Sequence, residues 1–158
     1  MTDNKNITVR MADVDDITDI YELIAELAEY EHAADEVINT PDQLLKDWQN
    51  GYFKAWVAQL NGQTIGMALC YDRYSTWKGR CLYLEDIVVK QSHRRSGAGS
   101  ALMQALVKYA TENRYYSINW QVLTWNEPAL NFYKKWKAEI DKEWWNGRLI
   151  VHQNQQEK

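Results

Sequence analysis

The sequence is poor in the residues that crosslink a chain or bind metals. Its 158 residues include two cysteines and three scattered histidines, which disfavours a disulfide scaffold or a Cys/His metal site. No apolar run is long enough to span a membrane, and no basic-then-apolar leader opens the chain. We therefore expect a cytoplasmic protein without a metal or a membrane partner. Cys70 and Cys81 fall in strand-like runs and are expected to be reduced and buried.

The chain also lacks an internal boundary. It has only two prolines and no repeat, low-complexity tract or linker-like stretch. Its hydrophobic content of 46% supports a packed core. We expect a single domain over residues 1–158, with a polar tail at 153–158 that frays.

Basic residues are scarce in the first third of the chain. Residues 1–50 carry thirteen Asp and Glu against three Lys and Arg, a balance of −10. The rest carry nine acidic against fifteen basic residues, a balance of +6, and the two sum to −4. This division favours a cationic ligand in one part and an anionic ligand in the other, although solvated helix faces of opposite sign would give the same pattern. Despite many aromatic residues, the acidic balance argues against a nucleic-acid partner.

Hydrophobic periodicity and turn signals predict a mixed sheet with helices on its faces. Thr40-Pro41-Asp42-Gln43 is typical of a helix start, and Asn61-Gly62 of a hairpin turn. Strands are predicted at 7–11, 52–60, 64–74, 81–89 and 116–123, with a terminal hairpin at 139–145 and 148–152. Helices are predicted after Asp13 or Asp15, from 41 to about 50, after the glycine-containing loop to about 114, and over 128–135.

The most informative motif is Arg94-Arg95-Ser96-Gly97-Ala98-Gly99, which lies between a strand-like run and a helix-like run. A glycine-containing turn that opens a helix points backbone N–H groups the same way, and the helix dipole and two arginines add positive charge. The motif therefore predicts an anion site, most simply for a pyrophosphate. The loop lacks the Lys-Ser or Lys-Thr of a Walker loop and follows the fourth predicted strand, which argues against a dinucleotide-binding βαβ unit.

Four segments in this order resemble the GNAT acetyltransferase superfamily, and within it the diamine (spermidine/spermine) and thialysine N-acetyltransferases. They are 26–31, 82–86, 94–100 and 125–134. The resemblance implies an α/β GNAT fold, with a mostly antiparallel sheet of six to seven strands and about four helices. It implies a homodimeric enzyme that transfers the acetyl group of acetyl-CoA to a primary amine of a small cation by direct attack in a ternary complex. The alternatives are acetylation of a peptide or protein amine, and a non-catalytic acyl-CoA-binding module.

The resemblance also implies which residues contact acetyl-CoA. Main-chain groups of Ile87, Val88 and Val89 would bind the pantetheine arm. The loop and helix start would bind the pyrophosphate through Arg94, Arg95, Ser96, Gly97, Ala98, Gly99 and Ser100. A second segment comprises Asn126, Glu127, Pro128 and Ala129. The family usually has glycine at the position of Arg95 and near Lys137. A positive φ would strain Lys137, so we expect that turn to differ.

Two residues are implied as catalytic. Tyr133 matches the tyrosine that protonates the leaving thiolate, and a phenol of pKa about 10 can donate that proton. From the pattern alone, Tyr133 would be a core residue beside Phe132. Glu85 would orient the substrate ammonium and accept its proton through water. Because neighbouring strand residues alternate, we expect Glu85 and Asp86 to lie on opposite faces of the sheet.

The amine site is expected at the end of the acidic first helix. By the resemblance, Glu31 would hold the distal ammonium of a diamine while Tyr30 packs on its methylene chain, with Glu85 at the reacting nitrogen. Glu31 is otherwise one of many solvated acids. Weaker candidates for the same pocket are Asn119, Trp120, Gln121 and Trp77.

Overall fold

The computed structural model describes residues 6–151 of the chain. The chain divides into two compact units, one up to Gln121 and one from Val122 onward, and each has its own architecture. The polar tail expected at 153–158 lies outside the described residues, and the single domain over 1–158 stays a prediction. No helix of the described part is long and apolar enough to cross a membrane.

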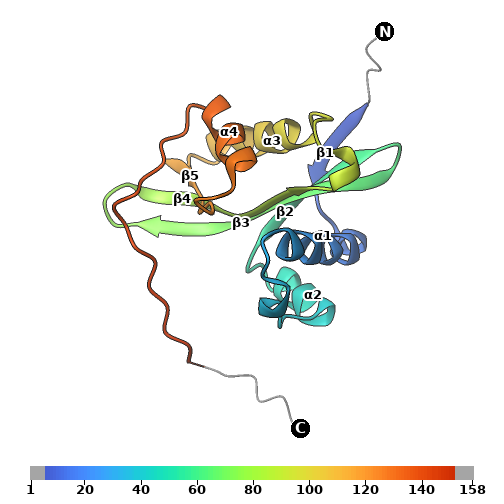
Figure 1. The fold of residues 1–158 in the computed structure, drawn as a ribbon, viewed down its shortest axis with the longest axis horizontal. Helices are drawn as coiled ribbons and strands as arrows, with labels where there is room; N and C mark the ends of the chain where they lie inside the picture. Colours follow the sequence, from blue (N-terminus) through green and yellow to red (C-terminus); the bar gives the residue numbers. More distant parts are fainter. Residues whose placement is uncertain (1–5, 152–158) are drawn as a thin grey trace. The chain divides into compact units, whose positions relative to one another are not determined.

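The first unit is built on a five-stranded sheet whose strands lie side by side in chain order (Figure 1). Neighbours from β1 to β4 are antiparallel, and β5 is parallel to β4. Asn61 and Gly62 join β2 to β3 with φ of 52° and 78°, the left-handed pair expected of an Asn-Gly hairpin. The strands are β1 (Ile7–Met11), β2 (Lys54–Leu60), β3 (Gln63–Ser75), β4 (Gly79–Val89) and β5 (Ser117–Asn119).

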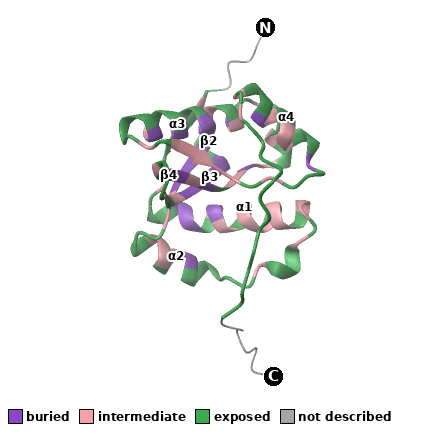
Figure 2. Cartoon of the chain, turned by 90° about the vertical axis from the view of Figure 1, so that its left-hand side faces the viewer, coloured by how far each residue is buried: buried purple, intermediate pink, exposed green. Residues whose placement is uncertain are grey.

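Helices cover both faces of this sheet. α1 (Ile17–Tyr30) and α2 (Pro41–Gln49) lie on one face, and α3 (Ala98–Glu112) lies on the other (Figure 1). The buried side of α1 faces the strands (Figure 2), and each fully buried Leu or Ile there contributes roughly 1.5–3 kcal/mol. The core cluster on this face comprises Ile17, Ile20, Leu23, Leu44, Ala55, Val57, Met67, Leu69 and Val88.

The predicted start of α2 is confirmed. Thr40 Oγ1 accepts the N–H of Gln43 at 3.2 Å, and Pro41 is the first helical residue. The cap satisfies one of the N–H groups that a helix leaves unpaired at its start, and proline needs no partner there.

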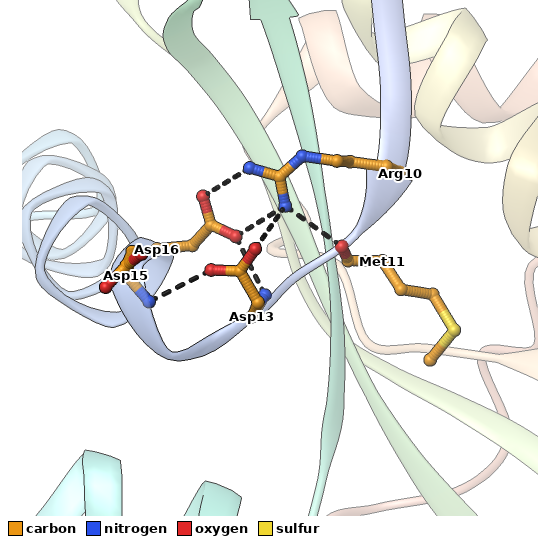
Figure 3. Close-up of polar contacts among 5 residues, drawn as sticks. All are labelled: Arg10, Met11, Asp13, Asp15 and Asp16. Atoms are coloured by element: carbon orange, nitrogen blue, oxygen red, sulfur yellow. Dashed lines mark hydrogen bonds and ion pairs between the residues drawn. The ribbon is translucent and has the colours of Figure 1, made fainter.

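An ion pair between the exposed Arg10 and the buried Asp16 fixes the start of α1 against the end of β1 (Figure 3). The Arg10 guanidinium donates to both carboxylate oxygens of Asp16, at 2.7 and 2.9 Å, and the Asp13 N–H donates to Asp16 at 2.8 Å. Asp13 in turn caps the short 3₁₀ turn Val14–Asp16. Burial alone would raise the pKa of Asp16, but the hydrogen bonds from Arg10 and Asp13 outweigh it and lower that pKa. The pair sets the direction in which α1 leaves the sheet.

The second unit contains α4 (Glu127–Lys135), followed by residues 136–151, which form neither helix nor strand. The predicted strand at 139–145 and the described part of its partner, 148–151, are therefore wrong, and His152 lies outside the described residues. The Asn146-Gly147 signal is local, whereas a hairpin is stable only when a third element covers it. For this reason the sheet of the described chain has five strands rather than six to seven. The strand predicted at 116–123 is also shorter, because only Ser117–Asn119 pair with β4.

Three helices each end in a turn of the same type. The left-handed residue of each turn carries a side chain, although glycine is more common at that position. His32, Arg114 and Lys137 have φ of 58°, 58° and 56° and follow α1, α3 and α4. After α4, the N–H of Ala138 donates to the Tyr133 carbonyl at 3.4 Å and the N–H of Lys137 to the Lys134 carbonyl at 3.0 Å, which is a Schellman motif. The expectation that the turn at Lys137 would differ is thus wrong, since the backbone keeps the left-handed conformation.

Candidate active site

A β-bulge in β4 determines where its two carboxylates point. Leu69 of β3 pairs with Asp86, but the next residue, Cys70, pairs with Leu84. Glu85 is therefore an extra residue in β4, opposite no residue of its own. A bulge resets the alternation of side chains between the two faces of a sheet.

The bulge brings Glu85 and Asp86 to the same face, which overturns the expectation of opposite faces. Asp86 lies opposite Leu69, whose side chain is in the core cluster beneath α1. Tyr71 is two residues from Leu69 and therefore shares its face, and its hydroxyl donates to Glu85 Oε2 at 3.0 Å. Both carboxylates thus point toward the side of the sheet that α1 covers.

Glu31 completes an acidic cluster with these two residues. It is the C-cap of α1, held by the turn at His32, and α1 packs against β4. Burial, together with the nearby carboxylates of Glu85 and Glu31, raises the pKa of Asp86 to about 6. Burial also raises the pKa of Glu31. Within the described residues, no Lys or Arg lies within ion-pair distance of these carboxylates, so the cluster favours a bound cation.

Two tyrosines lie beside Glu85, and an arginine packs on one of them. The rings of Tyr71 and Tyr83 are 5.1 Å apart and tilted by 32°. The Arg73 guanidinium lies 5.6 Å from the centre of the Tyr83 ring. These side chains come from the paired strands β3 and β4, so the sheet holds the Tyr71 hydroxyl next to the bulge.

Beyond the bulge, β4 has a strand partner on one side only. Ile87, Val88 and Val89 pair with β3, where Gly66 allows close approach because an added Cβ would lie 2.8 Å from the Val88 carbonyl. On the other side, β5 pairs with β4 only at Cys81–Tyr83. The described sheet therefore leaves one edge of the three residues open to an extended ligand, as the resemblance implies for the pantetheine arm.

The loop after β4 forms the start of α3. Gly97 has φ of 93° and is the N-cap, and Ser96 Oγ accepts the N–H of Ala98 at 3.3 Å. The first intrahelical bond is Ala101 N–H to the Gly97 carbonyl, so in the described chain the N–H groups of Gly99 and Ser100 have no protein acceptor. Such N–H groups and the positive end of a 15-residue helix suit a phosphate.

The two loop arginines differ in their surroundings. The Arg94 guanidinium lies 4.6 Å from the centre of the Tyr30 ring, at the end of α1. Arg95 has φ of 64° and is exposed. The chain therefore keeps at Arg95 the backbone conformation that suits the glycine usual in the family.

The second unit holds the remaining cofactor and catalytic candidates. Asn126 is buried, and its Oδ1 accepts the Ala129 N–H at 3.3 Å, so it caps α4. Glu127 and Pro128 are exposed in the first turn. Tyr133 is buried on α4, with its ring 5.4 Å from that of Phe132.

The weaker amine-site candidates lie elsewhere in the first unit. Asn119 ends β5 and accepts a hydrogen bond from Ser117 at 2.8 Å. Trp120 and Gln121 follow it, and Trp77 lies exposed in the β3–β4 turn.

Sequence reasoning missed two features of the site, the contact of Tyr71 with Glu85 and the membership of Asp86 in the acidic cluster. Their signal is not local, because it depends on the register between β3 and β4. Residue spacing within one strand cannot reveal a bulge whose evidence is the pairing of two strands. In the described chain, no group of His, Cys, Asp or Glu is arranged to hold a metal ion.

Comparison with known proteins identifies the class. The family model described as Acetyltransferase (GNAT) family matches residues 16–137. The thialysine N-epsilon-acetyltransferase of Caenorhabditis elegans is 33% identical over 129 residues, covering 82% of this chain and 81% of the relative. That of Bos taurus is 34% identical over 143 residues, covering 84% of each. The chain belongs to the GNAT acetyltransferase family and is an N-acetyltransferase.

A solved structure shows the same fold at lower identity. An aminoglycoside acetyltransferase from an uncultured soil metagenomic sample, in complex with trehalose, superposes with a TM-score of 0.79. It is 20% identical, and the match covers 96% of this chain and all of that one. This likeness confirms the α/β GNAT fold.

Proposed function

We propose that this acetyltransferase moves the acetyl group of acetyl-CoA to a primary amine of a small molecule carrying a second cationic group. The observation that carries the proposal is the acidic cluster of Glu31, Glu85 and Asp86. A carboxylate whose pKa is raised to about 6 by burial and like charges gains stability when a cation replaces its proton. A ligand with two ammonium groups would compensate two of these charges.

The residues present fit acetyl-CoA as the co-substrate. The open edge of Ile87–Val89 offers main-chain groups to an extended amide-containing arm. The start of α3 offers the N–H groups of Gly99 and Ser100, with Arg94 and Arg95 alongside, to a pyrophosphate. Asn126, Glu127, Pro128 and Ala129 stay a second proposed contact segment on the strength of the resemblance.

The reaction requires two proton transfers, one from the substrate ammonium and one to the leaving thiolate, and each involves a different residue. An alkyl ammonium has a pKa near 10.4 and must lose a proton before its nitrogen can attack a carbonyl carbon. Glu85 orients that group and accepts its proton through water. The nitrogen–carbon bond forms as the carbon–sulfur bond breaks, and Tyr133 donates a proton to the departing thiolate.

Direct attack in a ternary complex fits better than an acetyl-enzyme. Cys70 and Cys81 are free and buried. Burial raises the pKa of the Cys70 thiol to about 12, which removes the thiolate that a nucleophilic cysteine needs.

The names of the relatives support a more specific proposal for the substrate class. Thialysine N-epsilon-acetyltransferases match across most of this chain. A human spermidine/spermine N(1)-acetyltransferase-like protein is 32% identical over 134 residues, which is 79% of this chain and 19% of that protein. We infer a diamine, a polyamine or a thialysine-like amino acid as the acceptor. Glu31 at the C-cap of α1 would bind its distal ammonium, and Tyr30 its methylene chain.

Two substitutions test this assignment. Glu31→Gln should raise the KM of diamines about tenfold, as expected for a lost hydrogen bond to a charged group, and change that of monoamines less than about twofold. Glu29→Gln, an exposed acid on the same helix, is the matched control. Equal effects of Glu31→Gln on both amine classes would remove the distal-ammonium role.

The second substitution addresses the proton donor. Tyr133→Phe keeps the ring on α4 and should lower kcat about 100-fold or more without weakening acetyl-CoA binding. An unchanged kcat would exclude Tyr133 as the acid.

We also propose that the enzyme is a homodimer, as is usual in the family. Trp144, Trp145 and Leu149 are exposed in the segment that follows α4, and large apolar side chains of this kind are common at interfaces. Light scattering should give a mass near twice 18.6 kDa. A mass of one chain at micromolar concentration would contradict the dimer.

A further inference from the structure

We propose that Tyr71 is a positioning residue that holds the Glu85 carboxylate toward the reacting amine. The inference rests on the proposed function and adds a residue that the family resemblance did not assign. Its direct support is the hydrogen bond from the Tyr71 hydroxyl to Glu85 Oε2 at 3.0 Å.

Glu85 needs such a partner because of its place in the bulge. It is the residue of β4 without a counterpart on β3, and its side chain is exposed. A free glutamate of this kind samples many rotamers, and fixing it in one costs up to about 1.5–2 kcal/mol. A donor that is already in place removes part of that loss before the substrate arrives.

Tyr71 is itself well fixed. Its backbone lies in β3 and pairs with Tyr83 of β4. Its ring packs on the Tyr83 ring, with 5.1 Å between the ring centres, and Arg73 lies over the Tyr83 ring. Burial and the neighbouring Glu85 carboxylate raise the pKa of Tyr71 to about 12. Its hydroxyl therefore stays protonated at neutral pH and acts as a constant donor.

The hydrogen bond also gives the two oxygens of the Glu85 carboxylate different partners. Oε2 accepts from Tyr71, which leaves Oε1 to accept from the ammonium or from the water that carries its proton. Asp86 and Glu31 are the other acids that face this space, from β4 and α1. In the described chain they have no equivalent tyrosine donor, so Tyr71 distinguishes Glu85 from the other two carboxylates.

The structure offers a matched control in the same ring pair. In the described chain, Tyr83 packs on Tyr71 but its hydroxyl makes no hydrogen bond to Glu85. Tyr83→Phe and Tyr71→Phe therefore remove the same atom from two adjacent rings, and only Tyr71→Phe removes the donor to Glu85.

The test measures kcat and KM for a diamine and acetyl-CoA in four proteins. They are the unmodified enzyme, Tyr71→Phe, Glu85→Gln and the double variant, with Tyr83→Phe as control and thermal unfolding to confirm folding. Tyr71→Phe should lower kcat about threefold to tenfold, the usual range for one hydrogen bond, with the KM of acetyl-CoA unchanged. In the Glu85→Gln background the same change should alter kcat less than about twofold, because Tyr71 acts through the Glu85 carboxylate. Tyr83→Phe should leave kcat within about twofold.

The outcomes separate the two levels of the account. Equal loss from Tyr71→Phe in both backgrounds, or equal loss from Tyr83→Phe, overturns the positioning role while the proposed function stands. An unmodified enzyme without turnover on any amine overturns the proposed function, and the positioning role with it.

Discussion

The Arg94 guanidinium lies over the Tyr30 ring, with 4.6 Å between the guanidinium carbon and the ring centre. Arg94 begins the loop proposed to bind the pyrophosphate, and Tyr30 is the last residue of α1, next to Glu31. A cation–π contact of this type is worth about 0.5–1 kcal/mol at an exposed site. It joins the proposed cofactor loop to the proposed amine site within the first unit.

This contact predicts a specific coupling. Arg94→Gln should weaken acetyl-CoA binding, and Tyr30→Leu should reduce the effect of Arg94→Gln by about twofold to fivefold in Kd. Arg95→Gln is the control, because no ring of residues 6–151 packs on Arg95 as Tyr30 packs on Arg94. Calorimetric titration with acetyl-CoA measures the three single variants and the two double variants that combine Tyr30→Leu with each arginine substitution. Additive effects of Tyr30→Leu and Arg94→Gln would show that the two side chains act independently.

The acidic cluster predicts that ionised Asp86 lowers the stability of the folded chain. Its pKa is raised to about 6 in the folded chain, against about 3.9 when unfolded. A carboxyl with a raised folded pKa favours folding below the unfolded value and loses this contribution as pH rises toward 6. Asp86→Asn should therefore be about 1–2 kcal/mol more stable than the unmodified protein at pH 8.

Urea unfolding at pH 4 and pH 8 checks this prediction. The gain in unfolding free energy from Asp86→Asn should shrink toward zero at pH 4. The control Glu29→Gln should change the unfolding free energy by less than about 0.5 kcal/mol at either pH. An Asp86→Asn variant less stable than the unmodified protein at pH 8 would contradict the claim that burial and the neighbouring carboxylates destabilise ionised Asp86.

The Arg10–Asp16 pair predicts the opposite pH dependence. The pKa of Asp16 is lowered, so its contribution is present above the unfolded pKa of about 3.9 and is lost as pH falls through the folded value. Asp16→Asn should cost about 1–3 kcal/mol of unfolding free energy at pH 7, because the buried carboxylate that accepts both Arg10 hydrogen bonds loses its charge. The neighbouring Asp15→Asn should cost about 0.5 kcal/mol or less. An Asp16→Asn variant with an unchanged free energy of unfolding would exclude the Arg10–Asp16 pair as a determinant of stability.

The left-handed helix ends predict gains from glycine. Arg114 follows α3 with φ of 58°, a conformation that is unfavourable for a side chain by roughly 1 kcal/mol. Arg114→Gly should be about 1 kcal/mol more stable than Arg114→Ala, and the same ranking should hold for Lys137 if α4 unfolds with the rest. Thermal unfolding of each Gly and Ala pair tests this directly. An alanine variant as stable as its glycine counterpart would show that the turn relaxes.

Local signals predicted the elements well where a single segment carries the information. The Thr40 cap with Pro41, and the Asn61-Gly62 turn, act within a few residues, and both are confirmed. The same kind of signal failed at Asn146-Gly147, because a hairpin also needs a surface to cover it. The left-handed residue at Lys137 was expected to change the turn, but the two hydrogen bonds that close it are retained.

The candidate site divides in the same way. The loop from Arg94 to Gly99 could be recognised because an anion site at a helix start is local. The shared face of Glu85 and Asp86, and the contact of Tyr71 with Glu85, depend on which residue of β3 opposes which residue of β4. A strand sequence alone leaves that register undetermined.

Release of CoA thiol from acetyl-CoA in the presence of an amine panel tests the central claim most directly. The panel should contain a diamine, thialysine, a monoamine of equal length and a peptide with a free amine. The account predicts turnover with the diamine or thialysine at a kcat/KM at least about tenfold above that of the monoamine. Turnover with the peptide alone would point to a macromolecular substrate. Stabilisation by acetyl-CoA without thiol release from any amine would contradict the account and identify a binding module.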